Sequence, residues 1–333
     1  MSAAIRLYAP GDLRIESVEE APAPGPGEVR MRVERAGICG SDLHNFRTGQ
    51  WISRSPSIPG HEFVARVEAV GDGVAALRVG DRVVADSRVT CGRCPACLAG
   101  HPIHCAAMGF VGEVNDGGFQ RFVTLPARQV SALADQTLPA EVAVLAEPLA
   151  VALHAVNRLG ARTDRPVLVV GAGPIGALAA LILAHRGVET VMLVDRNARR
   201  LDRAAAASGA LPVSLGDLPH RPAFAIDATG SAAAVGQTLS ELESGGRIAL
   251  VGLFHGTADL PMNAVVERGL DIVGCAAFDD ELGEAIALLT PLADRLACLA
   301  AAPVPISGVP GAYSDLLSGE SAVIKATIDP WLT

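Results

Sequence analysis

The sequence predicts an α/β protein with a β-rich first domain and a second domain built on a doubly wound parallel sheet. The chain of 333 residues is longer than one hydrophobic core usually supports, so two domains are expected. Residues 1–146 contain short β-branched runs that Gly, Pro and Asp interrupt, which predicts strands and turns. In residues 147–280 strand-like and helix-like segments alternate, as in a parallel sheet covered by helices. Residues 281–333 are expected to return to the first domain.

Three β-rich runs define the strands expected in the first domain. They are EVRMRVERAGI, HEFVARVEAVG and DRVVADSRV, at residues 28–38, 61–71 and 81–89. Several short strands of this kind predict a partly open barrel or a sandwich. The run EVAVLAEPLAVALHAVNRLG at residues 141–160 then has helical spacing, and Gly160 is expected to end that helix.

The second domain is predicted from a regular succession of segments. The expected strands are VLVV, TVMLVD, FAIDATG, RIALVGL and LDIVGC, and the expected helices are IGALAALILAHRG and ARRLDRAAAASG. Strands separated by helices of this length predict parallel pairing. A further helix, DDELGEAIALLTP, and a closing strand, SAVIKATID, are expected to follow.

The segment from Val167 to Ala184 has two interpretations because its eighteen residues carry no charge. A run of that length is enough for a transmembrane helix. It would be the only span, however, and it contains Pro174 together with three glycines in G-A-G-P-I-G. In a dinucleotide-binding unit Gly171 makes the tight turn, Gly173 admits the pyrophosphate, and Gly176 lets the helix pack on the strand. We therefore predict a phosphate-binding turn, with the pyrophosphate at the helix N-terminus.

Asp195 ends the next predicted strand, 19 residues after Gly176, where an acid is expected to hold the adenosine ribose. A carboxylate there favours NAD over NADP, because it accepts from the 2′-hydroxyl and repels a 2′-phosphate. Arg196, Arg199 and Arg200 follow closely, and they are either phosphate-binding residues or solvated charges on a helix. The predicted cofactor-binding residues are Gly171, Gly173, Pro174, Ile175, Gly176, Asp195, Arg196 and Arg200. A buried apolar helix with an incidental acid after it is the alternative.

Composition excludes several classes of function. The net charge of −9 argues against a nucleic-acid-binding surface. The N-terminal stretch MSAAIRLYAP has no basic patch before an apolar run, so we expect a cytoplasmic protein without a secretory signal. Seven cysteines in such a chain indicate metal binding or catalysis before a disulfide framework.

Four of the cysteines form a compact cluster with the spacing C-x2-C-x2-C-x7-C: Cys91, Cys94, Cys97 and Cys105. Four thiolates in a loop with glycines and prolines can close a tetrahedron around zinc, and a closed site of this kind is structural. An iron–sulfur cluster is the alternative, but its common run ends in C-x3-C-P. His101 and His104 could replace a cysteine as ligands, although four cysteines suffice.

A second metal site is predicted from residues that lie far apart in the sequence. Cys39 lies in GICGSDLH, His61 and Glu62 in PGHE, and Glu147 in AEPLAVALH. One Cys, one His and one or two carboxylates can leave a coordination position open, as catalytic zinc requires. Each residue alone also fits a core or surface role, so spacing does not join them.

The order of these motifs is similar to that of the zinc-dependent medium-chain dehydrogenase/reductase family. The resemblance covers GICGSDLH, GHE, the cysteine cluster, GGF, AEP, GAGPIG with the later Asp195, and IDATG. It implies a GroES-like catalytic domain and a Rossmann domain, with the active site in the cleft between them. It also implies two zinc ions per chain: a structural ion on the four cysteines, and a catalytic ion on Cys39, His61 and either Glu62 or Glu147. The family pattern G-H-E-x-x-G is broken by Ala65, and we expect a small local adjustment of the loop without loss of the metal.

The resemblance further implies an NAD-dependent oxidation of a secondary alcohol. The glutamate of AEP points to the polyol branch, which includes sorbitol and idonate dehydrogenases, with threonine dehydrogenase as a cousin. Ser41 and His44 resemble a proton relay, although a turn residue and a surface imidazole are the plain alternatives. The predicted catalytic residues are Cys39, Ser41, His44, His61, Glu62 and Glu147.

Other functions stay open at this point. An amino-alcohol dehydrogenase of the threonine type is the main rival, and a catalytically silent NAD-binding sensor is a more remote one. The expected partners are a small alcohol substrate and further copies of the chain in a dimer or tetramer, with no nucleic acid and no membrane.

Overall fold

The computed structural model describes residues 1–254 and 256–333 and divides the chain into two compact units. The first unit contains Met1–Glu147, Leu282–Glu320 and Lys325–Thr333, and the second contains Pro148–Glu281 and Ser321–Ile324. The sequence analysis placed its boundaries after residues 146 and 280, and it did not anticipate that residues 321–324 would belong to the second unit.

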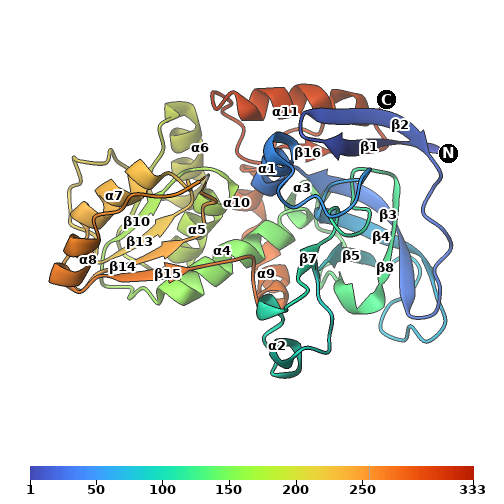
Figure 1. The fold of residues 1–333 in the computed structure, drawn as a ribbon, viewed down its shortest axis with the longest axis horizontal. Coiled ribbons are helices and arrows are strands. Elements are labelled where there is room, and N and C mark those ends of the chain that lie inside the picture. Colours follow the sequence, from blue (N-terminus) through green and yellow to red (C-terminus); the bar gives the residue numbers. More distant parts are fainter. Residues whose placement is uncertain (255) are drawn as a thin grey trace. The chain divides into compact units, whose positions relative to one another are not determined.

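The first unit is rich in antiparallel strands (Figure 1). Its main sheet has the order β16-β3-β4-β5-β9, and β8 pairs with β3. Two further two-stranded sheets, β1-β2 and β6-β7, lie outside that sheet. The strands are β1 (Ser2–Ala9), β2 (Asp12–Val18), β3 (Glu28–Gly37), β4 (Glu62–Val70), β5 (Arg82–Ala85), β6 (Arg88–Val89), β7 (Gly109–Phe110), β8 (Phe122–Pro126), β9 (Val130–Ala132) and β16 (Thr327–Ile328).

The helices of this unit are short. They are α1 (Gly40–Thr48), α2 (Pro95–Leu98), α3 (Ala140–Ala143), α9 (Leu282–Leu289), α10 (Ala293–Ala297) and α11 (Val309–Leu317), with 3-10 turns at Pro102–His104, Ala127–Gln129 and Ile306–Gly308. The helix α4 (Ala146–Leu159) begins in the first unit and continues in the second.

Strand β3 shows why the predicted strands form. Val29, Met31 and Val33 are fully buried, whereas the residues between them are partly exposed. This period of two puts one face of the sheet into the core and the other toward solvent. Tyr313 and Val309 of α11 belong to the same core as these strand residues.

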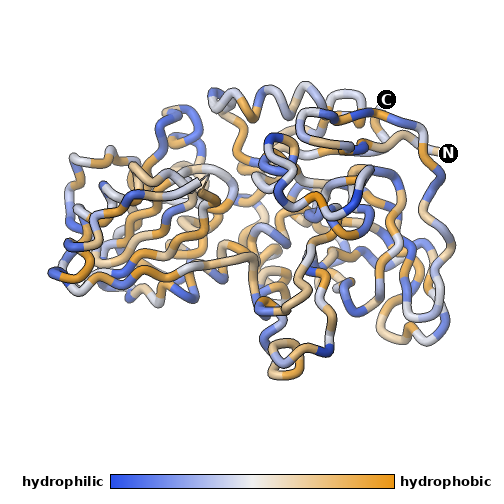
Figure 2. The backbone as a smooth tube through the Cα atoms, in the orientation of Figure 1, coloured by the Kyte–Doolittle hydropathy of each residue, from blue (hydrophilic) through white to orange (hydrophobic). Residues whose placement is uncertain are grey.

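The second unit is a six-stranded parallel sheet with the order β12-β11-β10-β13-β14-β15. Its strands appear hydrophobic along most of their length in Figure 2. This order is that of a dinucleotide-binding sheet, in which the strand order reverses beside the first strand, here β10. Its elements are β10 (Val167–Val170), α5 (Pro174–His185), β11 (Val191–Val194), α6 (Ala198–Ser208), β12 (Leu211–Pro212), β13 (Phe224–Asp227), α7 (Ala232–Glu241), β14 (Arg247–Leu250), α8 (Met262–Arg268) and β15 (Asp271–Gly274).

The apolar segment from Val167 to Ala184 is a strand, a turn and a helix, which confirms the dinucleotide-binding fold predicted for it. The strand VLVV is buried along its whole length, as expected for the centre of a parallel sheet. By length and composition a different helical segment, Ala140–Leu159, could cross a membrane, but 83% of its apolar window is buried inside the protein.

The closing strand predicted at residues 321–329 is much shorter than expected. Only Thr327 and Ile328 pair with β3. Upstream of them the Lys325 backbone donates to Leu299 and accepts from Ala301, so this part of the chain pairs with a loop. The alternation of apolar and polar residues in this segment does not show whether it pairs with β3 or with the loop at residues 299–301.

Candidate functional site

The first group of predicted site residues begins at Cys39, which caps the N-terminus of α1. Asp42 in the first turn accepts a hydrogen bond from the Cys39 backbone amide, with 2.8 Å between the two atoms. An acid at this position of a helix is the usual partner of the capping residue. Gly49 ends the helix in the left-handed conformation with φ = 67°. The local sequence CGSD therefore fixes the backbone that carries the Cys39 thiol.

His61 enters the site at the start of β4. The preceding Gly60 has φ = 98°, and a Cβ there would collide with the ring of Phe119. His61 Nδ1 lies 3.8 Å from a carboxylate oxygen of Asp42, and Nε2 lies 3.5 Å from the hydroxyl of Ser41. The imidazole is thus held between two residues of α1, although Asp42 was not predicted as a site residue.

Cys39, His61 and Glu62 each offer a ligand atom, and the three atoms lie within 4.8 Å of one another. The site fits a cation, because the negative charges of Cys39 and Asp42 favour positive charge there. Burial by itself would lower the pKa of His61, but the negative charges of Cys39 and Asp42 outweigh burial and hold that pKa well above its usual value. A sulfur, a nitrogen and an oxygen donor, the last two from buried residues, suit zinc.

Lys325 is a further residue beside the ligand group that the sequence analysis did not predict. Its side chain is 1% exposed and forms an ion pair with Glu62. Its Nζ also donates to the carbonyl oxygen of Ile38 at 3.0 Å. A Cβ at Gly37 would collide with both partners of the ion pair, so the chain next to Cys39 requires glycine there. A lone lysine inside the apolar run AVIKATI was the signal available in the sequence.

Glu147 lies in the first turn of α4, and it is buried. Its Oε1 accepts from the Ser87 hydroxyl at 2.6 Å. Burial, and next the charge of Glu62, raise the pKa of Glu147 to about 7, although His61, Ser87 and Lys325 act in the opposite direction. Glu147 is not in the ligand group with Cys39, His61 and Glu62. The charges of His61 and Glu62 nevertheless act on its carboxylate.

The two residues predicted as a proton relay have different surroundings. Ser41 lies against His61, as described above. His44 is buried one turn further along α1, with Nε2 2.8 Å from Gln50 Oε1 and its ring 4.3 Å from that of Trp51. The relay therefore stays a prediction, and Gln50 is a partner that the sequence analysis did not name.

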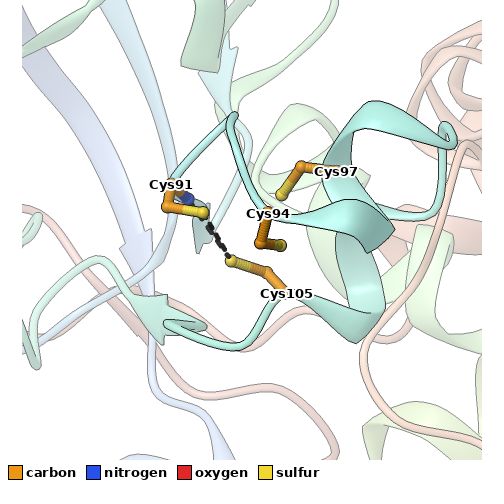
Figure 3. Close-up of side chains that lie close together, drawn as sticks. All are labelled: Cys91, Cys94, Cys97 and Cys105. Carbon is orange, nitrogen blue, oxygen red and sulfur yellow. Dashed lines mark hydrogen bonds between the residues drawn. The ribbon is translucent and has the colours of Figure 1, made fainter.

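The four remaining predicted ligands form a separate cluster, and their side chains point toward one another in Figure 3. The sulfur atoms lie within 4.8 Å of one another and make no disulfide. The Cys105 sulfur accepts from the backbone amides of Cys91 and Ala107 at 3.3 and 3.4 Å. Amide donors of this kind stabilise negative charge on sulfur.

The thiols of this cluster differ in pKa. Backbone amides of Cys97 and Ala106 lower the pKa of Cys94 to about 6. Burial, together with the neighbouring thiols, raises the pKa of Cys97 to about 12. A thiolate forms readily at Cys94 and is opposed at Cys97, so the set fits a dication that stabilises negative charge on several sulfurs at once. His101 and His104 bound the short helix before Cys105 and are not in the ligand group.

The predicted phosphate-binding turn lies between β10 and α5. Gly171 has φ = 101°, and a Cβ there would lie 2.9 Å from Thr229. A Cβ at Gly176 would collide with the Gly171 carbonyl, so only glycine allows this close packing of helix and strand. Gly173 faces open space and Pro174 begins the helix, followed by Ile175. The first amides of the helix that follows have no intrahelical acceptor, so this turn suits an anion such as a pyrophosphate.

Asp195 lies beside the same turn. Its carboxylate accepts from the Ala172 amide at 2.8 Å and from the Asn197 amide at 2.7 Å. Arg200 lies 3.9 Å from the carboxylate and donates to the Ser321 carbonyl at 2.6 Å, whereas Arg196 is exposed. The acid and the glycine turn are thus joined directly by a hydrogen bond within the second unit.

Comparisons with known proteins agree with this division of the chain. The model of the alcohol dehydrogenase GroES-like domain matches residues 25–135, and the model of the zinc-binding dehydrogenase matches residues 174–291. An L-threonine 3-dehydrogenase of Deinococcus radiodurans is 33% identical over 270 residues, which are 77% of each chain.

Solved structures extend the likeness to almost the whole chain. A short chain alcohol dehydrogenase of E. coli CFT073, complexed with NADH, is 28% identical with a TM-score of 0.88, and the match covers 98% of both chains. The 2R,3R-butanediol dehydrogenase of Bacillus subtilis is 26% identical with a TM-score of 0.87, and the match covers 98% of this chain and 99% of that one.

Proposed function

Because this chain belongs to the zinc-dependent medium-chain dehydrogenase/reductase family, we propose that it oxidises a secondary alcohol to a ketone with zinc and NAD. The observation that carries the proposal is the convergence of Cys39, His61 and Glu62 within 4.8 Å. The substrate that we propose is a polyol or a sugar acid. The carboxylate of Glu147 in place of a second thiolate supports this choice, because it can accept a hydrogen bond from a further hydroxyl.

Zinc bound to this set would supply Lewis acidity toward the substrate hydroxyl, and NAD would accept the hydride. The residues of the chain would orient the metal ligands and transfer the proton of the substrate. Asp42 lies on the Nδ1 side of His61 and would orient it, and Ser41 on the Nε2 side would accept the hydroxyl hydrogen of the substrate. His44, one turn further along α1, is proposed to pass that proton on toward solvent, and Gln50, which follows the helix, would orient its imidazole.

We also propose two zinc ions per chain and a preference for NAD. The second ion would lie on the cluster of four cysteines, where it would hold the loop and not take part in the reaction. Asp195 supports NAD, because its carboxylate suits a ribose diol and opposes a phosphate. The Asp195→Ser variant tests this preference by kinetics with both cofactors. A shift toward NADP is expected, whereas a parent enzyme that already prefers NADP would remove the role given to Asp195.

An amino alcohol of the threonine type is the second candidate substrate. It is favoured by the L-threonine 3-dehydrogenase that shares 33% identity with this chain. The two candidates differ in the group beside the reacting hydroxyl, which is a hydroxyl in polyols and an ammonium in threonine.

A substrate screen tests the proposal and separates the candidates. Purified protein with zinc and NAD is offered sorbitol, idonate, 2,3-butanediol and L-threonine, and NADH formation is followed by its absorbance. Turnover of the polyols above threonine is the expected result, whereas turnover of threonine alone favours the second candidate. No NADH from any alcohol, with bound NADH and zinc verified, would support a silent cofactor-binding protein and contradict the proposal.

A further inference from the structure

A short segment near the C-terminus, Ser321–Ile324, belongs to the second unit, although the chain on either side of it belongs to the first. We call these four residues the strap. The Ser321 carbonyl oxygen accepts two hydrogen bonds from side chains, one from Arg200 Nη2 at 2.6 Å and one from Asn197 Nδ2 at 3.3 Å. Two side chains of the second unit thus converge on one backbone atom of the strap.

Both donors flank Asp195, the acid predicted to hold the cofactor ribose. Asn197 donates its backbone amide to Asp195 at 2.7 Å and caps α6, where its Oδ1 accepts from the Arg200 amide at 3.1 Å. Arg200 Nη1 lies 3.9 Å from the Asp195 carboxylate, while Nη2 of the same guanidinium donates to the strap. Because the guanidinium is small and planar, the Ser321 carbonyl and the Asp195 carboxylate lie around one group. The strap is therefore adjacent to the predicted ribose acid.

These contacts determine what Arg200 offers a bound cofactor. Arginine recognises a phosphate best through two parallel N–H donors. In Arg200 one terminal nitrogen donates to Ser321 and the other lies beside Asp195. Its Nε is buried and has no acceptor among residues 1–254 and 256–333, so a single donor remains in place of a fork. Arg200 is thus arranged to hold the strap and not to grip a 2′-phosphate.

We propose that the strap forms one wall of the cofactor site beside Asp195, and that Arg200 is a positioning residue that holds this wall in place. A wall that is ordered before the cofactor arrives lowers the entropic cost of binding. It serves NAD and NADP alike, so the choice between the two cofactors stays with Asp195. The inference rests on the cofactor site proposed above for the second unit.

The first test asks whether Arg200 holds the strap in the cofactor-free chain. Hydrogen exchange of the peptide that contains residues 321–324 is followed by mass spectrometry in wild type, Arg200→Met and Arg199→Met. Arg199 is the exposed neighbour on the same helix and is the matched control. Loss of a hydrogen bond from a charged donor should speed exchange of the strap about tenfold in Arg200→Met and leave it unchanged in Arg199→Met. Equal exchange in wild type and Arg200→Met would contradict the inference.

The second test asks whether the strap belongs to the cofactor site. The dissociation constants of NADH and NADPH are measured by fluorescence titration in wild type, Arg200→Met and Ser321→Gly. Ser321→Gly removes the hydroxyl that accepts from the Val323 amide at 3.3 Å, so it loosens the strap without changing Arg200. We expect Arg200→Met to raise both constants about tenfold and Ser321→Gly to raise both about two- to fivefold, with their ratio unchanged.

Two results of this titration would overturn the inference. A rise in the NADPH constant alone in Arg200→Met would make Arg200 a phosphate ligand. Unchanged constants in Ser321→Gly, with faster exchange of the strap, would separate the strap from the cofactor site. A wild-type chain that binds neither NADH nor NADPH would instead overturn the proposed function on which the inference rests.

Discussion

The two candidate metal sites of the first unit are built in opposite ways. The cluster of four cysteines lies within fifteen residues of chain, and three of its cysteines are partly exposed. The set of Cys39, His61 and Glu62 draws on distant segments, and around it are the buried side chains of Asp42, Glu147 and Lys325. A site that holds a loop together needs only its ligands, whereas a site meant for chemistry needs charges around them that set orientation and proton affinity.

The difference predicts how the two sites respond to the loss of a charge outside the ligands. Lys325→Met should have the largest effect on stability, because it leaves the Glu62 carboxylate buried without its counter-charge. Removing one partner of a buried pair costs about 3–5 kcal/mol. Urea unfolding of the chelator-treated chain measures the loss. In the double variant Glu62→Gln/Lys325→Met much of that stability should return, and an equally unstable double variant would show that Lys325 acts through packing.

Lys325 also shows which features of the molecule could not be predicted from the sequence. The parallel sheet, the glycine turn and the cysteine cluster were predictable because their signals are local: a period, a spacing or a short motif. The ion pair of Lys325 with Glu62 joins residues far apart in the chain, so no local pattern announces it. For the same reason Ser87 beside Glu147 was missed, and the closing strand was overextended across Lys325, where the chain turns aside to residues 299–301.

Glu147 tests the comparison further, because among the described residues the ligand group of the cysteine cluster contains cysteines only. Glu147→Ala is expected to lower kcat/KM for polyols at least tenfold, or about 1.4 kcal/mol, since a contact made in the transition state would be lost. Steady-state kinetics and a melting curve are measured together. If Glu147 only caps its helix, kinetics will stay unchanged and stability will fall by less than about 1 kcal/mol.

Glu113 gives a smaller effect with a definite sign. Its side chain is half-buried and accepts from Asn45 at 2.9 Å, and burial raises its pKa from 4.5 to about 7. Because the folded chain holds this proton more tightly than the unfolded chain, stability from this group is present below pH 4.5 and falls as pH rises toward 7.

Glu113→Gln should therefore flatten the pH dependence of stability by about 1 kcal/mol, after allowance for solvent screening. Glu19→Gln on the exposed surface is the control and should leave the slope unchanged. Denaturation curves across this pH range give the slopes. An identical slope in wild type and Glu113→Gln would mean that Glu113 is solvated in the folded chain.

The most direct measurement is the metal content and activity of three purified chains: wild type, Cys39→Ser and Cys97→Ser. We expect about two zinc ions in wild type and about one in each variant, since the ligand sets are separate. Cys39→Ser should fold, bind NADH and have no turnover, whereas Cys97→Ser should lower the melting temperature and keep measurable turnover. One zinc in a fully active wild type, or an active Cys39→Ser, would contradict the division into a structural and a catalytic site.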